Sequence, residues 1–260
     1  MNILVTICAR AGSKGVKSKN MREFLGAPIC LYTLSAYRLF CARYGAKYGG
    51  FDLAVNTDAD ELYAQIDRAG VPYLKVPRKP ELAGDAVEKG AVLRDTLKAA
   101  QEMTGKAYDC VLDMDLTSPL RRVEDIANII DVFFANPGAE AALSVTESRR
   151  NPYFNQMVRA ENGFYKLAIQ SDFIARQQAP EVFDANASLY VYSPRFLLES
   201  NRILIRAKLV CSTMPDTAVL DIDSERDFEI MQLLADYFYR TDPAFGEVRD
   251  GITAFGRDLT

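Results

Sequence analysis

The first group of residues able to do chemistry is a basic loop near the start of the chain. It contains two glycines and four basic residues: Gly12, Gly15, Arg10, Lys14, Lys17 and Lys19. Glycine lets backbone N–H groups approach an anion, and clustered lysine and arginine neutralise its charge. The spacing matches neither G-x-x-x-x-G-K-[ST] nor G-x-G-x-x-G. We therefore expect a phosphate site of a different kind.

Two Asp-x-Asp pairs form the second group, Asp113 with Asp115 and Asp221 with Asp223. In an extended segment, side chains two residues apart point to the same face, so either pair could bind one hard cation. Alternatively, Asp223 and Ser224 cap the following helix, and Asp113 bonds to nearby backbone. A basic loop together with an acidic pair indicates a nucleotide whose phosphates are bridged by Mg²⁺.

The chain contains no histidine among its 260 residues. This excludes a Ser-His-Asp triad, a Cys-His dyad and an H-E-x-x-H zinc site. Phosphoryl and nucleotidyl transfer do not need imidazole, because the protein mainly positions groups and offsets charge. A proton leaving an attacking hydroxyl would then pass to a carboxylate or to metal-bound solvent.

The composition limits the possible binding partners and the cellular compartment of the protein. The formal charge is −4 without a long basic run, which argues against nucleic-acid binding. The apolar runs are far shorter than the roughly 20 residues of a membrane-spanning helix, and the N-terminus lacks the basic leader of a signal peptide. The five cysteines are scattered, with no C-x₂-C pair. We expect a cytoplasmic protein that does not bind membranes.

Strand-like and helix-like stretches alternate through the first half of the chain. They cover residues 3–8, 29–44, 52–56, 60–69, 73–76, 87–103, 110–114 and 123–134. This alternation predicts an α/β fold with a mostly parallel sheet covered by helices on both faces. Ligands bind outside the carboxyl ends of such strands. The polar segments 9–15, 56–58 and 115–119 should therefore meet at one crevice.

Residues 141–192 change to short β-like pieces, with turns at Asn151-Pro152 and Asn162-Gly163. No flexible linker separates them, so we expect one domain over residues 1–260 with a small antiparallel excursion at about 141–192. A strand-like piece at 208–212 and an amphipathic helix at 225–239 follow. The apolar stripe of this helix should face the core, with a subunit contact as the alternative.

Six segments together resemble the CMP-sialic acid synthetases, or acylneuraminate cytidylyltransferases, including their legionaminic and pseudaminic acid relatives. Residues 9–20 resemble the loop A-R-x-x-S-K-G-x-x-x-K-N. The other matches are 56–58 to S/T-T-D, 78–85 to R-P-x-x-L-A-x-D, 117–121 to T-S-P-L-R, 186–190 to N-G-A/S-I-Y and 221–225 to D-I-D-T/S-E. They occur in the family's order and span residues 2–239.

The resemblance implies a Rossmann-like nucleotidyltransferase fold, often a homodimer in which the excursion of one subunit reaches its partner's site. It implies that CTP and a nine-carbon 2-keto-3-deoxy sugar acid give the CMP-sugar and pyrophosphate. By the matched motifs, Arg10, Ser13, Lys14, Lys19 and Asn20 would hold CTP, with Arg78 and Asp85 close by. Asp221 and Asp223 would bind Mg²⁺.

The sequence departs from the sialic acid pattern near the acceptor. Asp115 replaces a glutamine, and Asp184 replaces an arginine that often precedes the N-G-A/S-I-Y motif. Such changes should alter which sugar acid is accepted, although Asp115 could instead supply an extra metal ligand. The residues expected to contact the acceptor are Asp115, Thr117, Arg176, Asp184 and Asn186, with Arg149 and Arg150 as weaker candidates.

Two other interpretations remain open from the residues. The crevice could belong to a sugar-phosphate nucleotidyltransferase or a glycosyltransferase, although the G-x-G-x-R-L-x-P loop of the former is missing. It could also belong to a nucleotide-binding module without catalysis. Pyrophosphate release that depends on a sugar acid would separate the cytidylyltransferase from all of these.

Overall fold

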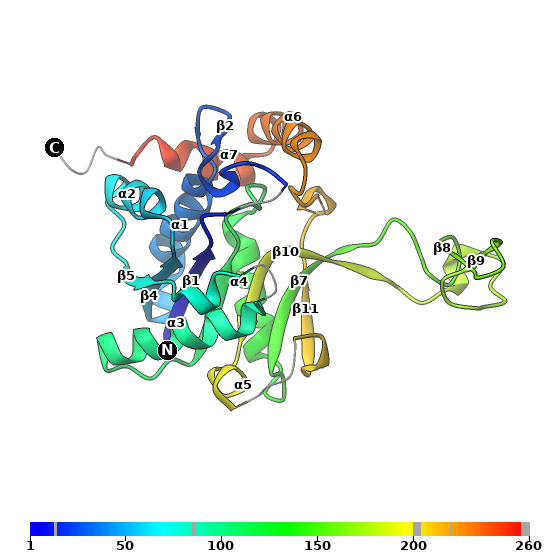
Figure 1. The fold of residues 1–260 in the computed structure, drawn as a ribbon, viewed down its shortest axis with the longest axis horizontal. Helices are drawn as coiled ribbons and strands as arrows, with labels where there is room; N and C mark the ends of the chain where they lie inside the picture. Colours follow the sequence, from blue (N-terminus) through cyan, green and yellow to red (C-terminus); the bar gives the residue numbers. More distant parts are fainter. Residues whose placement is uncertain (13–14, 85–86, 200–203, 219, 256–260) are drawn as a thin grey trace.

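The computed structural model describes residues 1–12, 15–84, 87–199, 204–218 and 220–255. A seven-stranded sheet in the order β11-β7-β10-β6-β1-β4-β5 forms its centre (Figure 1). The strands are β1 (Asn2–Ala9), β4 (Gly50–Thr57), β5 (Leu74–Pro77), β6 (Cys110–Met114), β7 (Ala141–Glu147), β10 (Phe183–Tyr192) and β11 (Leu209–Thr213). Strand β10 is antiparallel to both of its neighbours, and all other neighbours in this sheet are parallel. The mostly parallel α/β fold is therefore confirmed.

Helices cover both faces of the sheet, which explains the uninterrupted apolar run of β1. Ile3, Val5 and Ile7 point to the face covered by α1 (Cys30–Tyr48), α2 (Asp60–Ala69) and α4 (Val123–Phe134). Leu4 points to the opposite face, covered by α3 (Lys89–Thr104) and α5 (Pro194–Glu199). None of the helices in the described ranges has the length and apolar character needed to span a membrane.

A third apolar cluster forms above the carboxyl ends of the strands. It joins the small hairpin of β2 (Glu23–Phe24) and β3 (Ala27–Pro28) to α6 (Glu225–Thr241) and α7 (Pro243–Ile252). Phe228, Met231 and Ala235 of α6 are buried in it, as expected for the core-facing stripe. The short 3₁₀ helices are η1 (Lys19–Met21), η2 (Pro80–Leu82), η3 (Arg176–Gln178), η4 (Leu204–Arg206) and η5 (Asp216–Ala218).

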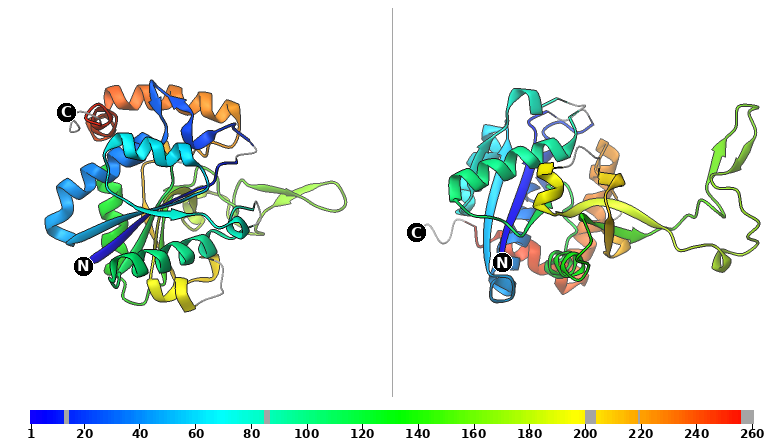
Figure 2. Two further views of the ribbon diagram at one scale, coloured as in Figure 1. Left: turned by 60° about the vertical axis from the view of Figure 1, so that its left-hand side comes forward. Right: turned by 90° about the horizontal axis from the view of Figure 1, so that it is seen from below.

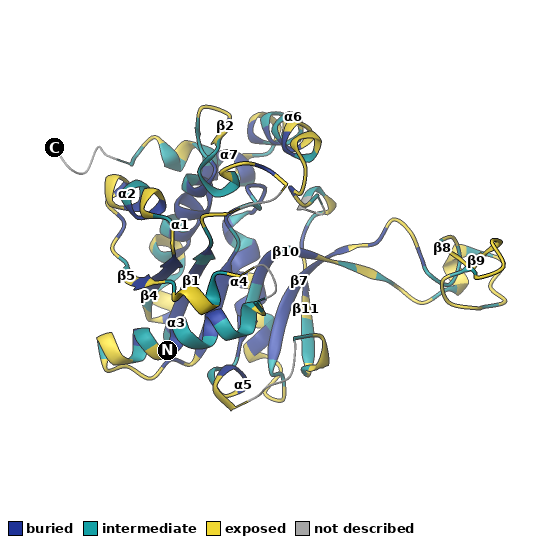
Figure 3. Ribbon diagram, in the orientation of Figure 1, coloured by how far each residue is buried: buried dark blue, intermediate teal, exposed yellow. Residues whose placement is uncertain are grey.

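An arm projects from the body between β7 and β10 (Figures 1 and 2). The predicted excursion, 141–192, consists of these two strands of the main sheet and the projecting segment between them, 148–182. This segment carries the hairpin of β8 (Met157–Arg159) and β9 (Tyr165–Leu167). Most of it is exposed (Figure 3), including the apolar side chains of Phe164 and Ile174, which are 75% and 86% exposed.

Candidate active site

A pocket of about 350 Å³ opens at the carboxyl ends of β1 and β6, beside the start of α3. Its walls include residues from several separate segments: Cys8, Ala9, Arg10, Gly12, Lys19, Asn20, Arg78, Leu82, Gly84, Val87, Lys89, Val92, Asp115, Leu116 and Thr117. The opening loop and the segment after β6 thus meet in one crevice, as predicted. The backbone N–H of Ala11 donates to Oδ1 of Asp58 at 2.7 Å, which brings in the third predicted segment.

Arg10, Lys19 and Asn20 lie in the wall formed by the opening loop. Nδ2 of Asn20 donates to the carbonyl oxygen of Arg10 at 3.2 Å, which fixes the loop after β1. Lys19 is partly buried, and its ammonium donates to the carbonyl oxygen of Ile222. Ser13 and Lys14 lie outside the described residues. The described part of this wall is cationic, so it can attract an anion.

Arg78 forms the neighbouring part of the wall through contacts with the end of β4. Its Nε donates to Oδ1 of Asn56 at 2.9 Å, and a terminal nitrogen donates to the carbonyl oxygen of the same residue at 3.0 Å. These bonds hold the guanidinium at the pocket. Asp85, which the sequence placed beside Arg78, lies outside the described residues.

The segment containing Asp221 and Asp223 packs directly against the opening loop. Lys19 Nζ lies 3.7 Å from Oδ1 of Asp223. A Cβ atom on Gly15 would lie 1.9 Å from the carbonyl oxygen of Asp223, so only glycine allows this approach. Desolvation, and then the charge of Asp223, raise the pKa of Asp221. The described ranges contain no group of three or more acidic, cysteine or histidine residues that could hold a metal ion.

The N-cap of α6 is Ser224, and the side chain of Asp223 takes no part in it. The side chain of Ser224 accepts a hydrogen bond from the backbone N–H of Asp227, and the Asp227 carboxylate accepts from the backbone N–H of Ser224. This capping box begins α6. The carboxylate of Asp223 is 83% exposed and remains accessible to a ligand.

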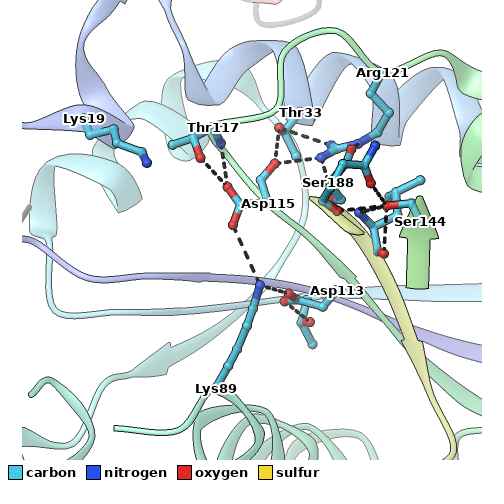
Figure 4. Close-up of polar contacts among 12 residues, drawn as sticks. Lys19, Thr33, Lys89, Asp113, Asp115, Thr117, Arg121, Ser144 and Ser188 are labelled. Carbon is cyan, nitrogen blue, oxygen red and sulfur yellow. Dashed lines mark hydrogen bonds and ion pairs between the residues drawn. The ribbon is translucent and has the colours of Figure 1, made fainter. Parts of the chain in front are cut away.

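The other acidic pair surrounds a lysine that sequence reasoning missed (Figure 4). Lys89 Nζ lies 2.6 Å from Oδ2 of Asp113 and 3.8 Å from Oδ2 of Asp115. Oδ1 of Asp113 accepts from the Thr6 hydroxyl at 2.8 Å. Thr117 donates to Oδ1 of Asp115 through both its backbone N–H, at 2.8 Å, and its hydroxyl, at 2.6 Å. Asp113 therefore contacts side chains and not the nearby backbone.

Electrostatics keep Lys89 and Asp115 ionised. Burial favours the neutral form of Lys89, but Asp113 and Asp115 outweigh it and raise the pKa of the lysine. Burial likewise opposes ionisation of Asp115, but Lys89 and the hydrogen bonds from Thr117 lower the pKa of this carboxyl below its usual value. The pocket thus contains an ammonium and a carboxylate side by side.

Arg121 holds the segment after β6 in place. It is 1% exposed, and it donates to the carbonyl oxygens of Asp115 and Ser188 at 2.9 and 2.8 Å and to the Ser188 hydroxyl at 3.0 Å. A weaker bond reaches Thr33 of α1 at 3.4 Å. Burial lowers the pKa of Arg121 to about 10, so the guanidinium remains charged at neutral pH. The arginine joins the pocket wall to β10 and α1 (Figure 4).

Comparison with curated proteins identifies the family. The chain is 33% identical over 232 residues to CMP-N,N'-diacetyllegionaminic acid synthase of Campylobacter jejuni, which covers 89% of this chain and 94% of that protein. It is 32% identical, with the same coverage, to post-translational flagellin modification protein B of Campylobacter coli. The chain belongs to the acylneuraminate cytidylyltransferase family. The resemblance inferred from the six motifs is therefore confirmed.

Other comparisons agree with this assignment. The chain is 26% identical to N-acylneuraminate cytidylyltransferase of Streptococcus agalactiae over 92% of its own length and 55% of that protein. Among solved structures, CMP:2-keto-3-deoxy-manno-octonic acid synthetase complexed with CTP superposes with a TM-score of 0.63 at 13% identity, covering 91% of this chain and 99% of that one. No family model matches the chain. The structural likeness shows that the fold is that of a nucleotidyltransferase.

The remaining acceptor candidates of this cytidylyltransferase lie on or near the arm. Arg176 is exposed and donates to the carbonyl oxygen of Ser148 at 3.0 Å. Asp184 is half-buried opposite Thr146 of β7. Arg149, 77% exposed, pairs with the carboxylate of Asp216. The arm therefore holds its candidates outside the pocket wall.

Asn186 is buried where the arm enters the sheet. Its Oδ1 accepts from the Ser144 hydroxyl at 2.5 Å, and its Nδ2 contacts Sδ of Met214 at 3.5 Å. Both polar atoms of the Asn186 amide therefore contact protein groups, and the side chain lies between β7 and β10.

Two residues could have been found from the sequence. Lys89 is the first residue of α3, where the helix dipole disfavours a cation, so a lysine there signals a specific partner. Arg121 ends the T-S-P-L-R segment, which is otherwise uncharged.

Proposed function

We propose that the protein catalyses cytidylyl transfer from CTP to the anomeric hydroxyl of a nine-carbon 2-keto-3-deoxy sugar acid. The observation that carries the proposal is the contact of Lys19 with Ile222 and Asp223. It brings the basic opening loop and the acidic pair together beside one pocket, although about two hundred residues separate them. Phosphates with a bridging cation are the ligands that such a combination suits.

The cationic side chains in the pocket wall support a position for the triphosphate of CTP beside the opening loop. Arg10, Lys19 and Asn20 would hold the triphosphate together with Ser13 and Lys14, and Arg78 and Asp85 would lie close by. The oxygen of the anomeric hydroxyl forms a bond to the α-phosphorus, its proton passes to a carboxylate or to solvent, and the bond from the α-phosphorus to the bridging oxygen breaks, so pyrophosphate leaves. Arginine and lysine lower the repulsion between the incoming oxygen and the triphosphate.

The acidic pair fits Mg²⁺ as the cofactor. Desolvation, and then the charge of Asp223, raise the pKa of Asp221, which supports two carboxylates near enough to repel each other. Mg²⁺ takes one or two carboxylates and completes its shell with phosphate oxygens and water. Asp221 and Asp223 would hold it. When bound, the ion would draw charge from the phosphates and lower the pKa of a bound hydroxyl.

The acceptor is a nonulosonic acid. Among the relatives above 30% identity, one is named for N,N'-diacetyllegionaminic acid, so we place this acid first among the substrates to test. Asp115 and Thr117 in the pocket wall, with Arg176 and Asp184 on or near the arm, would select it. Asn186, whose amide is bonded inside the protein, would act by holding β10 in place. The departures Asp115 and Asp184 from the sialic acid pattern support a different acceptor preference.

We infer a homodimer in which the arm of one copy contacts the other. Exposed apolar side chains such as Phe164 and Ile174 on a projecting hairpin support this. The five cysteines are free, which suits the reducing cytoplasm as the site of the reaction. No nucleic acid or membrane partner is proposed.

Pyrophosphate release tests the function directly. The protein is incubated with CTP, MgCl₂ and each acid of a panel: legionaminic, pseudaminic, sialic and octulosonic types. Release that requires one acid supports the proposal, and release with none of them would favour a nucleotide-binding module. Asp221→Asn should lower the rate more than about a hundredfold and change the Mg²⁺ dependence. Asp236→Asn, which removes an exposed carboxylate from α6, should leave both unchanged.

A further inference from the structure

Lys89 and Asp115 leave hydrogen-bonding capacity unused at the pocket wall. The ammonium has three N–H donors; it pairs closely with Asp113, at 2.6 Å, and lies 4.7 Å from the centre of the Tyr190 ring. The 3.8 Å to Oδ2 of Asp115 is too long for a hydrogen bond. Oδ1 of Asp115 is occupied by Thr117, and no hydrogen bond from a described residue reaches Oδ2. Figure 4 shows this ion pair, and both side chains line the pocket and remain partly exposed, 37% for Lys89 and 28% for Asp115, so a ligand in the pocket can reach them.

The arrangement is costly to the fold, which indicates a use. Asp113 is 1% exposed and the Lys89 side chain is 37% exposed, and an ion pair with a buried carboxylate is often no more stable than apolar residues of the same size. A lysine at the first position of α3 also opposes the helix dipole.

The two carboxylates beside Lys89 disfavour a phosphate as its partner, although Arg10, Lys19 and Arg78 make other parts of the pocket wall cationic. Lys89 faces two carboxylates, Asp113 and Asp115, so the three groups together carry a negative charge. Burial raises the pKa of the neighbouring Cys8 thiol to about 12, so the thiol stays neutral and adds no further negative charge. The pocket that Lys89 lines also has uncharged wall residues, namely Cys8, Leu82, Val87 and Val92. A neutral, partly apolar group suits this end of the pocket.

We propose that Lys89 and Asp115 form a matched donor–acceptor pair that selects a neutral polar edge of the substrate, an edge with one acceptor and one donor side by side. The Lys89 ammonium donates to a carbonyl or ring-nitrogen acceptor, and Oδ2 of Asp115 accepts from the adjacent N–H. Asp113 is a positioning residue, because it holds the ammonium. This inference rests on the proposed function, whose two substrates offer such an edge in the aminopyrimidine of CTP and in an acylamino group of the sugar acid.

Calorimetric titration distinguishes the two sources without depending on turnover. The full chain is titrated, in MgCl₂, with CTP and with UTP, in which the donor and acceptor of the edge are exchanged. It is then titrated, with CTP present, with an acylamino sugar acid and with the analogue that has a hydroxyl in place of the acylamino group. These titrations give two affinity ratios, CTP over UTP and acylamino acid over hydroxyl analogue. In Lys89→Met, one of the two should fall by about 10- to 100-fold, the value of one charge-assisted hydrogen bond.

Matched variants separate recognition from folding. The double variant Lys89→Met with Asp113→Leu removes both charges together. It should unfold at the same temperature as the wild type and show the same fall in the affinity ratio as Lys89→Met. Lys89→Arg, which keeps a cationic donor, should retain part of the affinity ratio that Lys89→Met loses. Lys106→Met removes a lysine paired with Asp52 at 2.7 Å, at the other end of the sheet, and should change neither ratio.

The outcomes are distinct. A fall in the CTP/UTP ratio assigns the pair to the base, and a fall in the acid ratio assigns it to the acylamino group. If both ratios are unchanged in folded variants, the inference is wrong even when pyrophosphate release supports the cytidylyltransferase. A failure to release pyrophosphate with any acid would instead reject the proposed reaction and leave the binding ratios to judge the pair.

Discussion

The backbone of Gly15 lies so close to Asp223 that any side chain at position 15 would overlap the carbonyl oxygen of Asp223. This contact joins the basic opening loop to the segment that we propose to bind Mg²⁺. The glycine therefore determines the distance between the two halves of the site. Lys19 supports the same contact through the carbonyl oxygen of Ile222.

Gly15→Ala should separate these halves, since a Cβ atom 1.9 Å from a backbone oxygen forces one segment to move. We expect kcat/KM for CTP to fall at least about tenfold, in line with small misplacements of reacting groups. Steady-state pyrophosphate release measures it. Gly45→Ala in α1, where the space around the Cβ position is open, should keep the wild-type rate. Equal rates for all three proteins would show that the contact does not position the site.

Arg121→Met tests whether a buried arginine positions the pocket. The substitution leaves the carbonyl oxygens of Asp115 and Ser188 without their donor, and we expect a loss of about 2–4 kcal/mol in the free energy of unfolding. Urea unfolding measures this loss. Arg240→Gln breaks an exposed pair with Asp236 and should cost less than about 0.5 kcal/mol. A loss no larger than that of the control would contradict the role of Arg121.

Much of the scaffold could be predicted because local pattern and tertiary burial agree. The expected bounds of α2, β6 and α4 coincide with the observed ones, since each alternates with a polar turn and buries a regular apolar face. Helix α7 was missed, although Asp242 caps it and Pro243 occupies its first turn, because two glycines weaken its helical pattern.

The site was predictable only where one segment carries its own chemistry. The opening loop combines charge and glycine within a few residues directly after a strand, so its place in the pocket wall could be predicted, and its phosphate role stays a prediction. The contact of Lys89 with Asp113 could not, because it depends on which helix covers the face of β6 to which Asp113 points. Periodicity assigns each residue to an element, but it does not identify the side chain that faces it across the layer.

Asp115 should make stability depend on pH. Its pKa in the folded protein is lowered by Lys89 and Thr117 against the effect of burial. The unfolded chain therefore binds the proton more tightly, and the stabilisation is complete above the unfolded value near 3.8 and is lost as the pH falls through the lower folded value. The difference in unfolding free energy between wild type and Asp115→Asn should be larger at pH 6 than at pH 3.

Urea unfolding at both pH values measures this difference. Asp236→Asn controls for the removal of one carboxylate from the surface. A difference for Asp115→Asn that is the same at pH 6 and pH 3 would show that Lys89 and Thr117 do not favour its ionised form.

The arm should determine the oligomeric state. An isolated two-stranded hairpin is marginally stable in water, and the arm exposes Phe164 and Ile174 almost fully, so a second copy would bury what the body of the same chain does not cover. Sedimentation should give twice the chain mass of 29.0 kDa. Phe164→Ser with Ile174→Ser should shift the protein to the monomer and reduce turnover. Met103→Ser, at an exposed apolar side chain near the end of α3, should leave the dimer intact. A wild-type monomer would refute the dimer, and a dimer that survives the arm substitutions would place its interface elsewhere.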